Sequence, residues 1–173
     1  MISMYPMNTR PQAAPVQPPR RRLGSGIQVR RSGVHGKGVF ATRDFEPGEA
    51  VIEYTGELIS WDEALRRHPH DPDQPDHTFY FQLEDGRTID ALYGGNSARW
   101  INHSCDPNCE AEETDGRVFI KALRAIRAGE ELNYIYGLTL DERYTPALKK
   151  RFECRCGAAS CTGTLLVPKR RRR

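Results

Sequence analysis

Two short segments of the chain concentrate side chains that can do chemistry. The segment 99–108, RWINHSCDPN, places an amide, an imidazole, a hydroxyl and a thiol in four consecutive positions. The segment 130–136, EELNYIY, carries two tyrosines two residues apart, which puts them on one face of a strand. Taken alone, His103 could equally be a core histidine beside a turn, and Tyr134 and Tyr136 could be aromatic residues of a core or its rim.

The five cysteines are placed in a way that favours a metal site. Cys105 and Cys109 lie in mid-chain, whereas Cys154, Cys156 and Cys161 lie together in CRCGAASC. An odd number of cysteines in a chain without features of secretion argues against a disulfide scaffold. A tetrahedral structural zinc site needs four ligands, so the C-terminal cluster supplies three and requires one more. The Cys-x-Cys spacing is shorter than that of usual zinc fingers and does not settle the metal alone.

A glycine-containing turn, HGKG at 35–38, follows a predicted strand. Its two glycines allow the backbone to approach a ligand closely, with φ values that other residues avoid. A plain tight turn explains the same pattern. The turn is not a dinucleotide-binding fingerprint, because no long helix of a βαβ unit follows it.

The elements that must position these residues are short strands, so the predicted fold class is mostly β with few short helices. Strands are predicted in IQVRRS (27–32), VFATR (39–43), EPGEAVIEYTG (46–56), a hairpin in TFYFQLEDGRTIDAL (78–92) that turns at Asp85-Gly86, and two strands in 116–136 around Ala128-Gly129. A helix is predicted over WDEALRRH (61–68), where Ser60 and Glu63 form a capping box. One or two helical turns are predicted in GNSARWIN (95–102), and a further helical stretch is predicted after Pro146.

Charge is distributed unevenly along the chain. Residues 1–25 contain four Arg and no acid, and the KRRRR sequence at 169–173 adds five positive charges. Residues 26–168 carry 17 Lys and Arg against 23 Asp and Glu, a formal charge of −6. An acidic body argues against nucleic-acid binding by the core and suits a basic peptide ligand. The KRRRR tail could contact nucleic acid, act as an address, or be a solvated disordered end.

The length of 173 residues indicates one domain with tails. Residues 1–25 contain five prolines and little that could pack, which predicts a disordered basic arm. The chain lacks the ~18 consecutive apolar residues of a membrane span and the apolar stretch of a secretory signal. We therefore expect an intracellular protein that does not contact membranes.

Considered together, the motifs resemble those of SET-domain protein lysine methyltransferases. In order they are HGKG (35–38), EYTGE (53–57), RWINHSCDPN (99–108), GEELNYIY (129–136) and CxCxxxxC (154–161). The resemblance covers roughly residues 26–167, and RWINHSCDPNC is close to the family's RFINHSCxPNC. It implies a SET domain over 26–140, a post-SET zinc-binding segment over 141–167 and a basic tail over 168–173. It also implies several small curved sheets, with residues 102–105 threaded under the chain near 134–136 in a pseudoknot-like arrangement.

The resemblance further implies which residues form the site. The methyl donor S-adenosylmethionine would be bound by Gly36, Lys37, Gly38, Phe79, Arg99, Asn102 and His103. The catalytic residues would be Tyr54, Tyr134 and Tyr136, which line a channel for the target lysine, with Tyr136 at the family's catalytic tyrosine position. A structural Zn²⁺ would be held by Cys105, Cys154, Cys156 and Cys161. Cys109 is not among these ligands, and we expect it to be a small buried apolar residue.

Three departures from the family pattern have expected consequences. Phe79 stands where many relatives have a cofactor-contacting tyrosine, so one hydroxyl is missing. Ile135 replaces the frequent aspartate between the two tyrosines, which changes a surface contact and not the chemistry. After Cys161, TGTLLV lacks the aromatic residue that covers cofactor and substrate in some relatives, and Leu165 or Leu166 would replace it.

The implied function is S-adenosylmethionine-dependent protein-lysine N-methylation. The expected product is mono- or dimethyl-lysine in a basic protein such as a histone or a histone-like chromosomal protein. The enzyme would act as a monomer, in the cytoplasm or nucleoid of a prokaryote or in the nucleus or chromatin of a eukaryotic cell. One alternative is a catalytically weak SET module that binds lysine-bearing tails, against which the presence of Tyr136, Asn102 and His103 counts. The other is a small zinc-containing nucleic-acid-associated protein, which the acidic body disfavours.

Overall fold

The computed structural model describes residues 22–69, 73 and 77–168. Most of the predicted N-terminal arm and all of the KRRRR sequence lie outside the described residues. The elements follow in the order β1 (Ile27–Arg31), β2 (Lys37–Ala41), β3 (Ala50–Tyr54), β4 (Glu57–Ile59), α1 (Trp61–Arg67), β5 (Tyr80–Gln82), β6 (Thr88–Asp90), the 3₁₀ helix η1 (Ser97–Trp100), β7 (Asn102–His103), β8 (Cys109–Thr114), β9 (Arg117–Ala122), β10 (Asn133–Tyr134) and α2 (Pro146–Arg151).

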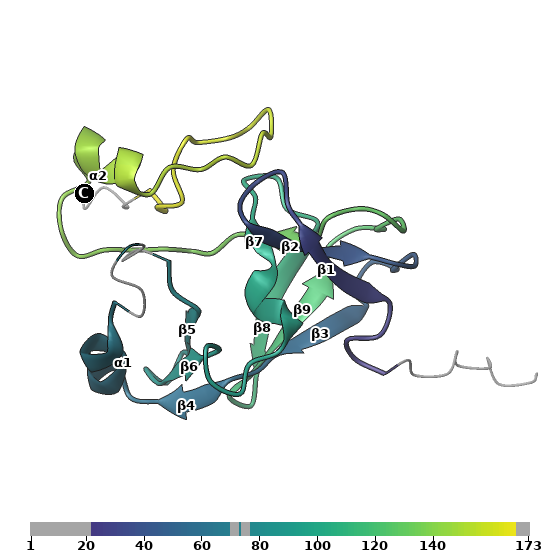
Figure 1. Cartoon of the computed structure of the whole chain (residues 1–173), viewed down its shortest axis with the longest axis horizontal. Coiled ribbons are helices and arrows are strands. Elements are labelled where there is room, and N and C mark those ends of the chain that lie inside the picture. Colours follow the sequence, from purple (N-terminus) through teal and green to yellow (C-terminus); the bar gives the residue numbers. More distant parts are fainter. Residues whose placement is uncertain (1–21, 70–72, 74–76, 169–173) are drawn as a thin grey trace, which may run out of the picture.

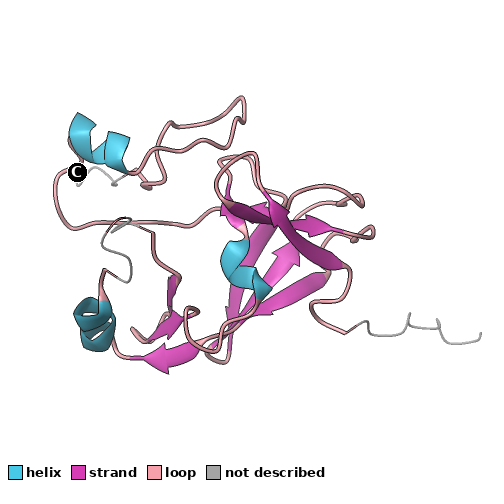
Figure 2. Ribbon diagram, viewed as in Figure 1, coloured by secondary structure: helices cyan, strands magenta, loops and turns pink. Residues whose placement is uncertain are grey.

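Short strands dominate the fold, as the sequence predicted, and in the described part they form four small sheets (Figures 1 and 2). Three sheets are antiparallel, namely β1–β2, β3–β9–β8 and β4–β6–β5. The fourth is the parallel pair β7–β10, in which Asn133 pairs with Asn102 and Tyr134 with His103. The described helices are short, and none of them has the length and apolar character that a membrane crossing requires.

The predicted turn at Gly86 and the cap at Ser60 are present, but the predicted capping box is only half formed. The β5–β6 hairpin turns through Gly86, whose φ of +85° lies in the region that favours glycine. The Ser60 hydroxyl accepts the N–H of Glu63 and caps α1, while the Glu63 carboxylate binds Arg66 and Arg67 and does not complete the capping box. Thr145 caps α2, which begins with a proline at its first turn.

Strand β8 was not predicted from the sequence. Its sequence, CEAEET, carries three glutamates and has low intrinsic strand propensity. It forms because it pairs over its full length with β9, whose alternate residues Val118, Ile120 and Ala122 are buried in the core. Tertiary pairing with an apolar neighbour thus overrides local propensity.

The core lies between the β1–β2 sheet and the β3–β9–β8 sheet. Its largest fully buried side chains include Phe45, Ile101, Ile120, Ile126 and Leu132. The 3₁₀ helix η1 contacts both β2 and β3, so the chain enters β7 from a fixed position against this core. The β4–β6–β5 sheet and α1 lie to one side, at the lower left of Figure 1.

The loop after β7 and the first residue of β10 are joined by a reciprocal pair of asparagines. The Asn108 N–H donates to Asn133 Oδ1 at 3.0 Å, and the Asn133 N–H donates to Asn108 Oδ1 at 2.9 Å. The Asn108 amide also donates to the Glu131 carbonyl at 2.9 Å. Asn108 is 2% exposed, so water cannot replace these bonds.

We expect Asn108→Ala to lower the free energy of unfolding by about 2 kcal/mol, because it leaves the Asn133 N–H without its acceptor and removes one of the two side-chain donors to the Glu131 carbonyl. Urea denaturation measures this loss. Thr114→Ala, at the exposed end of β8, serves as the control and should change stability by no more than about 0.5 kcal/mol. Equal stabilities of the two variants would show that the asparagine pair does not hold the segments together.

Candidate functional site

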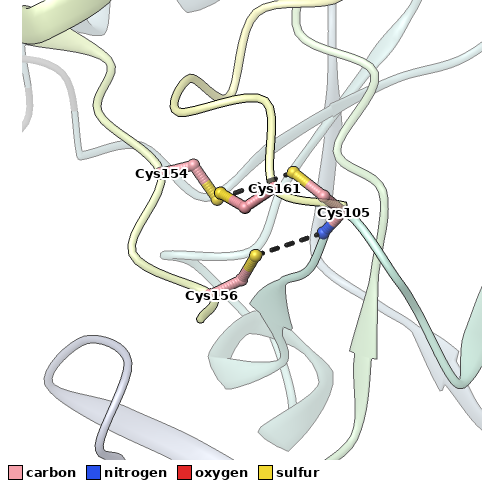
Figure 3. Close-up of side chains that lie close together, drawn as sticks. All are labelled: Cys105, Cys154, Cys156 and Cys161. Atoms are coloured by element: carbon pink, nitrogen blue, oxygen red, sulfur yellow. Dashed lines mark hydrogen bonds between the residues drawn. The ribbon is translucent and has the colours of Figure 1, made fainter. Parts of the chain in front are cut away.

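Four cysteine sulfurs converge on one point, as Figure 3 shows. Cys105, in the loop after β7, meets Cys154, Cys156 and Cys161 from the segment after α2, and the four Sγ atoms all lie within 4.8 Å of one another. The Sγ atoms of Cys105 and Cys154 are 3.8 Å apart. A tetrahedral zinc with bonds of about 2.3 Å to sulfur requires sulfurs about 3.8 Å apart. The four predicted ligands are therefore brought together in a cluster that could hold a zinc ion.

Backbone amides add donors to the cysteine cluster. The Cys105 N–H points at Cys156 Sγ at 3.5 Å, and the Gly163 N–H points at Cys161 Sγ at 3.4 Å. Burial raises the pKa of Cys156, but the N–H groups of Cys105 and Ala158 and the neighbouring thiols lower it to about 6. These N–H donors favour the thiolate form of Cys156, which suits a cation site.

Cys109 lies apart from this cluster. It is 0% exposed and belongs to the hydrophobic core. Burial raises the pKa of its thiol to about 12, so the thiol stays neutral. This agrees with its interpretation as a small apolar residue.

Among the described residues, the C-terminal segment is joined to the chain after β10 by an isolated bridge between Leu138 and Leu166. A second isolated bridge, between Glu153 and Thr164, lies within the segment itself. In Figure 1 this segment is the green-to-yellow chain that carries α2 above the strands. The meeting of Cys105 with the three later cysteines therefore connects it directly to the loop after β7.

Three tyrosines from distant parts of the chain form an aromatic cluster. Tyr54 ends β3 and Tyr134 ends β10, and both are buried. Tyr136 lies beyond the strand, which is shorter than predicted, yet its ring centroid stays 5.2 Å from that of Tyr134. The Tyr136 hydroxyl donates to the Ile101 carbonyl at 2.9 Å, and the Tyr54 hydroxyl donates to the Phe79 carbonyl at 3.0 Å.

The environment keeps all three phenols neutral. Burial is the main cause that raises the pKa of Tyr54, Tyr134 and Tyr136 above the ordinary tyrosine value, and neighbouring phenols raise those of Tyr54 and Tyr134 further. Neutral phenols can donate hydrogen bonds and orient a ligand, but they cannot take up a proton. Within the described part of the chain, the Tyr134 hydroxyl has no hydrogen-bond partner and is left for a ligand or a water.

His103 connects the tyrosines with the cysteine cluster. Its Nδ1 accepts the N–H of Tyr136 at 3.2 Å, and its Nε2 lies 3.4 Å from Cys105 Sγ. Burial lowers the pKa of His103, so the ring is neutral with its proton on Nε2. Both ring nitrogens are thus engaged within the protein. The contact predicted between His103 and a cofactor would therefore be made by the His103 backbone.

Asn102 joins the HGKG turn to the chain before β10. Its side-chain amide donates to the Lys37 carbonyl and to Glu131 Oε1, each at 2.9 Å. The same carboxylate oxygen accepts the Ser32 hydroxyl at 2.7 Å. A Cβ on Gly38 would overlap the Glu131 carboxylate, so a larger residue would displace this carboxylate from its position beside Asn102 and Ser32.

Glu131 is the site residue that sequence reasoning missed. It stands within the GEELNYIY motif, but a glutamate next to a turn has the pattern of a solvated charge. Only the fold shows that its carboxylate receives two side-chain donors from elsewhere in the chain.

Aromatic rings and two cations lie beside the HGKG turn. The Lys37 ammonium lies 4.5 Å from the Trp100 ring centroid, and the Arg99 guanidinium lies 4.9 Å from it. Phe79 packs edge-on against Trp100 with centroids 5.0 Å apart. Arg99 donates to the Ala91 carbonyl, but its buried Nε has no hydrogen-bond partner among the described residues. This arrangement offers positive charge and apolar ring surface to a ligand that carries a carboxylate and a ring.

The curated relatives of this chain are large proteins that it matches over a small part. The chain is 38% identical over 139 residues to the histone-lysine N-methyltransferase trithorax of Drosophila virilis. It is 36% identical over 139 residues to the human histone-lysine N-methyltransferase 2B. Each alignment covers 78% of this chain but only 3% and 5%, respectively, of the relative.

A solved structure and a family model complete the comparison. The structure of ctPRC2 in an autoinhibited conformation bound to S-adenosylmethionine aligns with a TM-score of 0.59 and 38% identity, over 65% of this chain and 15% of that one. The family model of the SET domain matches residues 36–137, a range that contains Gly36–Gly38 of the HGKG turn, the asparagine pair and the tyrosine cluster. This chain belongs to the SET-domain family.

Proposed function

We propose that the protein is an S-adenosylmethionine-dependent protein-lysine N-methyltransferase. The observation that carries the proposal is the cluster of neutral Tyr54, Tyr134 and Tyr136. The names of the relatives and the ligand of the solved SET structure support the same reaction class. We assign the SET domain to residues 26–140 and the post-SET zinc-binding segment to 141–167.

The residues beside the HGKG turn fit the methyl donor. S-adenosylmethionine supplies a sulfonium methyl group for transfer and carries a carboxylate and an adenine ring. Lys37 and Arg99 offer positive charge for the carboxylate, and Phe79 offers apolar ring surface. Gly36, Gly38, Asn102 and His103 complete the proposed set through their backbone and amide groups.

The tyrosine cluster would prepare the target lysine. Transfer to a sulfonium methyl requires a neutral amine, whereas a free lysine titrates near ~10.4. A channel lined by aromatic rings, of which those of Tyr54 and Tyr134 are buried, disfavours the ammonium form, so the proton would leave to solvent before the methyl transfer. Because the phenols are neutral, none of them serves as the base. Their role is to hold the amine in line with the methyl group, which is the main requirement of a displacement reaction.

The acidic body supports a basic substrate. Residues 26–168 carry a formal charge of −6, which attracts a positively charged protein such as a histone or a histone-like chromosomal protein. Such a substrate would place the enzyme on chromatin or the nucleoid, where the KRRRR tail could contact nucleic acid, and we propose that it acts as a monomer. Mass spectrometry of a lysate incubated with the enzyme and labelled S-adenosylmethionine would identify the modified protein.

Tyr136→Phe should nearly abolish methyl transfer while the fold stays intact, because the variant lacks the hydroxyl that Ile101 orients. The measurement is kcat on a methyl-accepting protein, with the thermal midpoint as a test of folding. Tyr80→Phe is a matched control, since it also removes a hydroxyl bonded to a backbone carbonyl, that of Ala64 at 3.1 Å, outside the site. If Tyr136→Phe keeps more than about a tenth of kcat, a loss under ~1.4 kcal/mol, the role of Tyr136 is wrong.

The purified protein should contain about one zinc per chain, because four thiolates complete a closed tetrahedral site. Metal analysis should show loss of zinc in Cys105→Ser and full zinc in Cys109→Ala. Chelation should abolish activity before the strands unfold, since the metal orders the C-terminal segment and not the sheets. Full zinc content in Cys105→Ser would exclude Cys105 as the fourth ligand.

Tyr134→Phe should shift the product from mainly monomethyl-lysine towards di- and trimethyl-lysine. The free Tyr134 hydroxyl can hold a water in the space that a methylated amine needs in order to turn and react again. Without the hydroxyl this water loses a hydrogen-bond partner, and its release recovers the ~0–2 kcal/mol of entropy that holding it in place costs. Mass spectrometry of a peptide product gives the ratio. An unchanged ratio in the variant, or abundant trimethyl-lysine from the unmodified enzyme, would contradict the proposed role.

A further inference from the structure

Charge separates the C-terminal region, residues 141–173, from the SET domain at 26–140. The SET domain carries 12 Lys and Arg against 20 Asp and Glu, a formal charge of −8. The C-terminal region carries 10 Lys and Arg against 3 Asp and Glu, a formal charge of +7. Five of its ten cations belong to the KRRRR sequence, and the other five lie within 141–168. The positive charge is therefore not confined to the tail.

The cations of the SET domain are largely neutralised within it. Most of them form ion pairs with carboxylates of the same domain, namely Arg43, Arg66, Arg67, Arg87, Arg117, Lys121, Arg124 and Arg127. A cation that is already paired contributes less positive potential toward an external anion. The SET domain thus offers little to a polyanion.

Three cations of the C-terminal region lack such partners. Arg143 precedes α2, and Lys149 and Lys150 lie in the last turn of this helix. All three are exposed, and none forms an ion pair with the residues that the structure describes. The helix dipole favours lysines at the end of a helix, but it does not account for an arginine before the helix begins. An external anion would account for all three.

A cavity of about 370 Å³ brings two of these cations together. Its lining includes Arg143, Tyr144, Lys149, Thr162, Thr164 and Pro168. The Thr162 and Thr164 hydroxyls donate to backbone carbonyls, each at 3.0 Å. The Tyr144 hydroxyl accepts the Leu140 N–H at 3.2 Å. Arg143 and Lys149 are thus the charged groups that the cavity presents to a ligand, which suits a phosphate group.

The cavity also lies where the basic tail begins. Pro168 lines it, and the KRRRR sequence follows Pro168 directly in the chain. Because consecutive Cα atoms are about 3.8 Å apart, the charges of the tail start within one residue of the cavity. In Figure 1, α2 and the end of the chain lie together at the upper left, away from the sheets. The unpaired cations and the start of the tail therefore share one region of the molecule.

The side chains of this region favour a nucleic-acid duplex over other polyanions. A membrane-binding helix presents large apolar side chains beside its cations. Within the described residues 141–168, no large apolar or aromatic side chain is exposed, and Leu148 of α2 is buried. A surface for single strands would need exposed aromatic rings on which bases stack. Arginine dominates the tail, and its planar guanidinium matches phosphate oxygens in a bidentate manner.

We propose that the C-terminal region binds the phosphate backbone of double-stranded nucleic acid through Arg143, Lys149 and Lys150 together with KRRRR. Phosphate contacts carry no sequence information, so the binding is independent of base sequence. The proposal does not rest on methyl transfer and uses none of the residues assigned to it. In combination with the proposed function, it gives the enzyme one charged surface for a basic protein and an opposite one for the nucleic acid that such a protein binds.

The test measures the affinity of the full chain for a short DNA duplex by fluorescence anisotropy, without S-adenosylmethionine, over a range of salt concentrations. Two duplexes of unrelated sequence should bind equally. The triple variant Arg143→Gln, Lys149→Gln, Lys150→Gln should bind about tenfold more weakly or worse at low salt. Its slope of log affinity against log salt should be smaller by about two to three, because each lost phosphate contact removes about 0.9.

A second triple variant, Arg87→Gln, Arg117→Gln, Arg127→Gln, is the matched control. It makes the same change in net charge, but its arginines are exposed side chains that pair with carboxylates of the SET domain. We expect it to keep its affinity within about threefold and to keep the salt slope, since distant charges are screened. The thermal midpoint and the metal content of both variants show whether the fold is intact.

Four outcomes would overturn the proposal. Unchanged affinity and slope in the first triple variant would do so even if replacement of KRRRR abolishes binding, because the tail would then act alone. An equal loss in both triple variants would show that net charge decides, and not its place. Equally tight binding to phosphatidylserine vesicles would indicate a membrane partner, and equally tight binding to polyglutamate would indicate an acidic protein. Because methyl transfer is not measured, failure of the proposed catalytic function would leave these results unaffected.

Discussion

The site depends on the pairing of two chain segments, residues 102–108 and residues 131–136. Backbone pairing in β7–β10 is only two residues long, which is too short to be stable alone. Side-chain amides extend it, because Asn102 binds the Glu131 carboxylate and Asn108 exchanges hydrogen bonds with Asn133. Asn108 is 2% exposed, so water cannot replace the bonds of the asparagine pair. The pairing thereby places the aromatic cluster, the glycine turn and the first cysteine ligand around one centre.

The sequence predicted most elements of the fold, because turns and caps leave local signals such as Asp85-Gly86 and Ser60. It did not predict β8, whose glutamates become a strand only against a buried partner. Local pattern likewise cannot show that a charged residue such as Glu131 is engaged by two distant donors. The four cysteine ligands were expected from the family resemblance, and the geometry brings their sulfurs together. Local sequence patterns do not show which distant segments pair, because that pairing is decided by contacts in the folded protein.

The same burial that forms the tyrosine cluster limits its chemistry. Removing phenols from water raises their pKa values, so Tyr54, Tyr134 and Tyr136 keep their protons and act as fixed dipoles. A reaction that needed a protein base would be poorly served by such a site. A displacement that needs a dry, oriented and uncharged amine is well served, because the environment that disfavours phenolate also disfavours ammonium.

A metal bound by the C-terminal segment would affect the tyrosine cluster although it does not lie within that cluster. Between α2 and Pro168 few apolar side chains are buried, among them Leu148 and Leu166, which is too small a core to order a chain segment. A zinc ion on the four thiolates would supply the missing stabilisation. Its effect would reach the active site through covalent neighbours and hydrogen bonds, because Cys105 Sγ meets the His103 ring and that ring accepts the Tyr136 N–H. The order of the C-terminal segment and the position of Tyr136 are therefore coupled through Cys105 and His103.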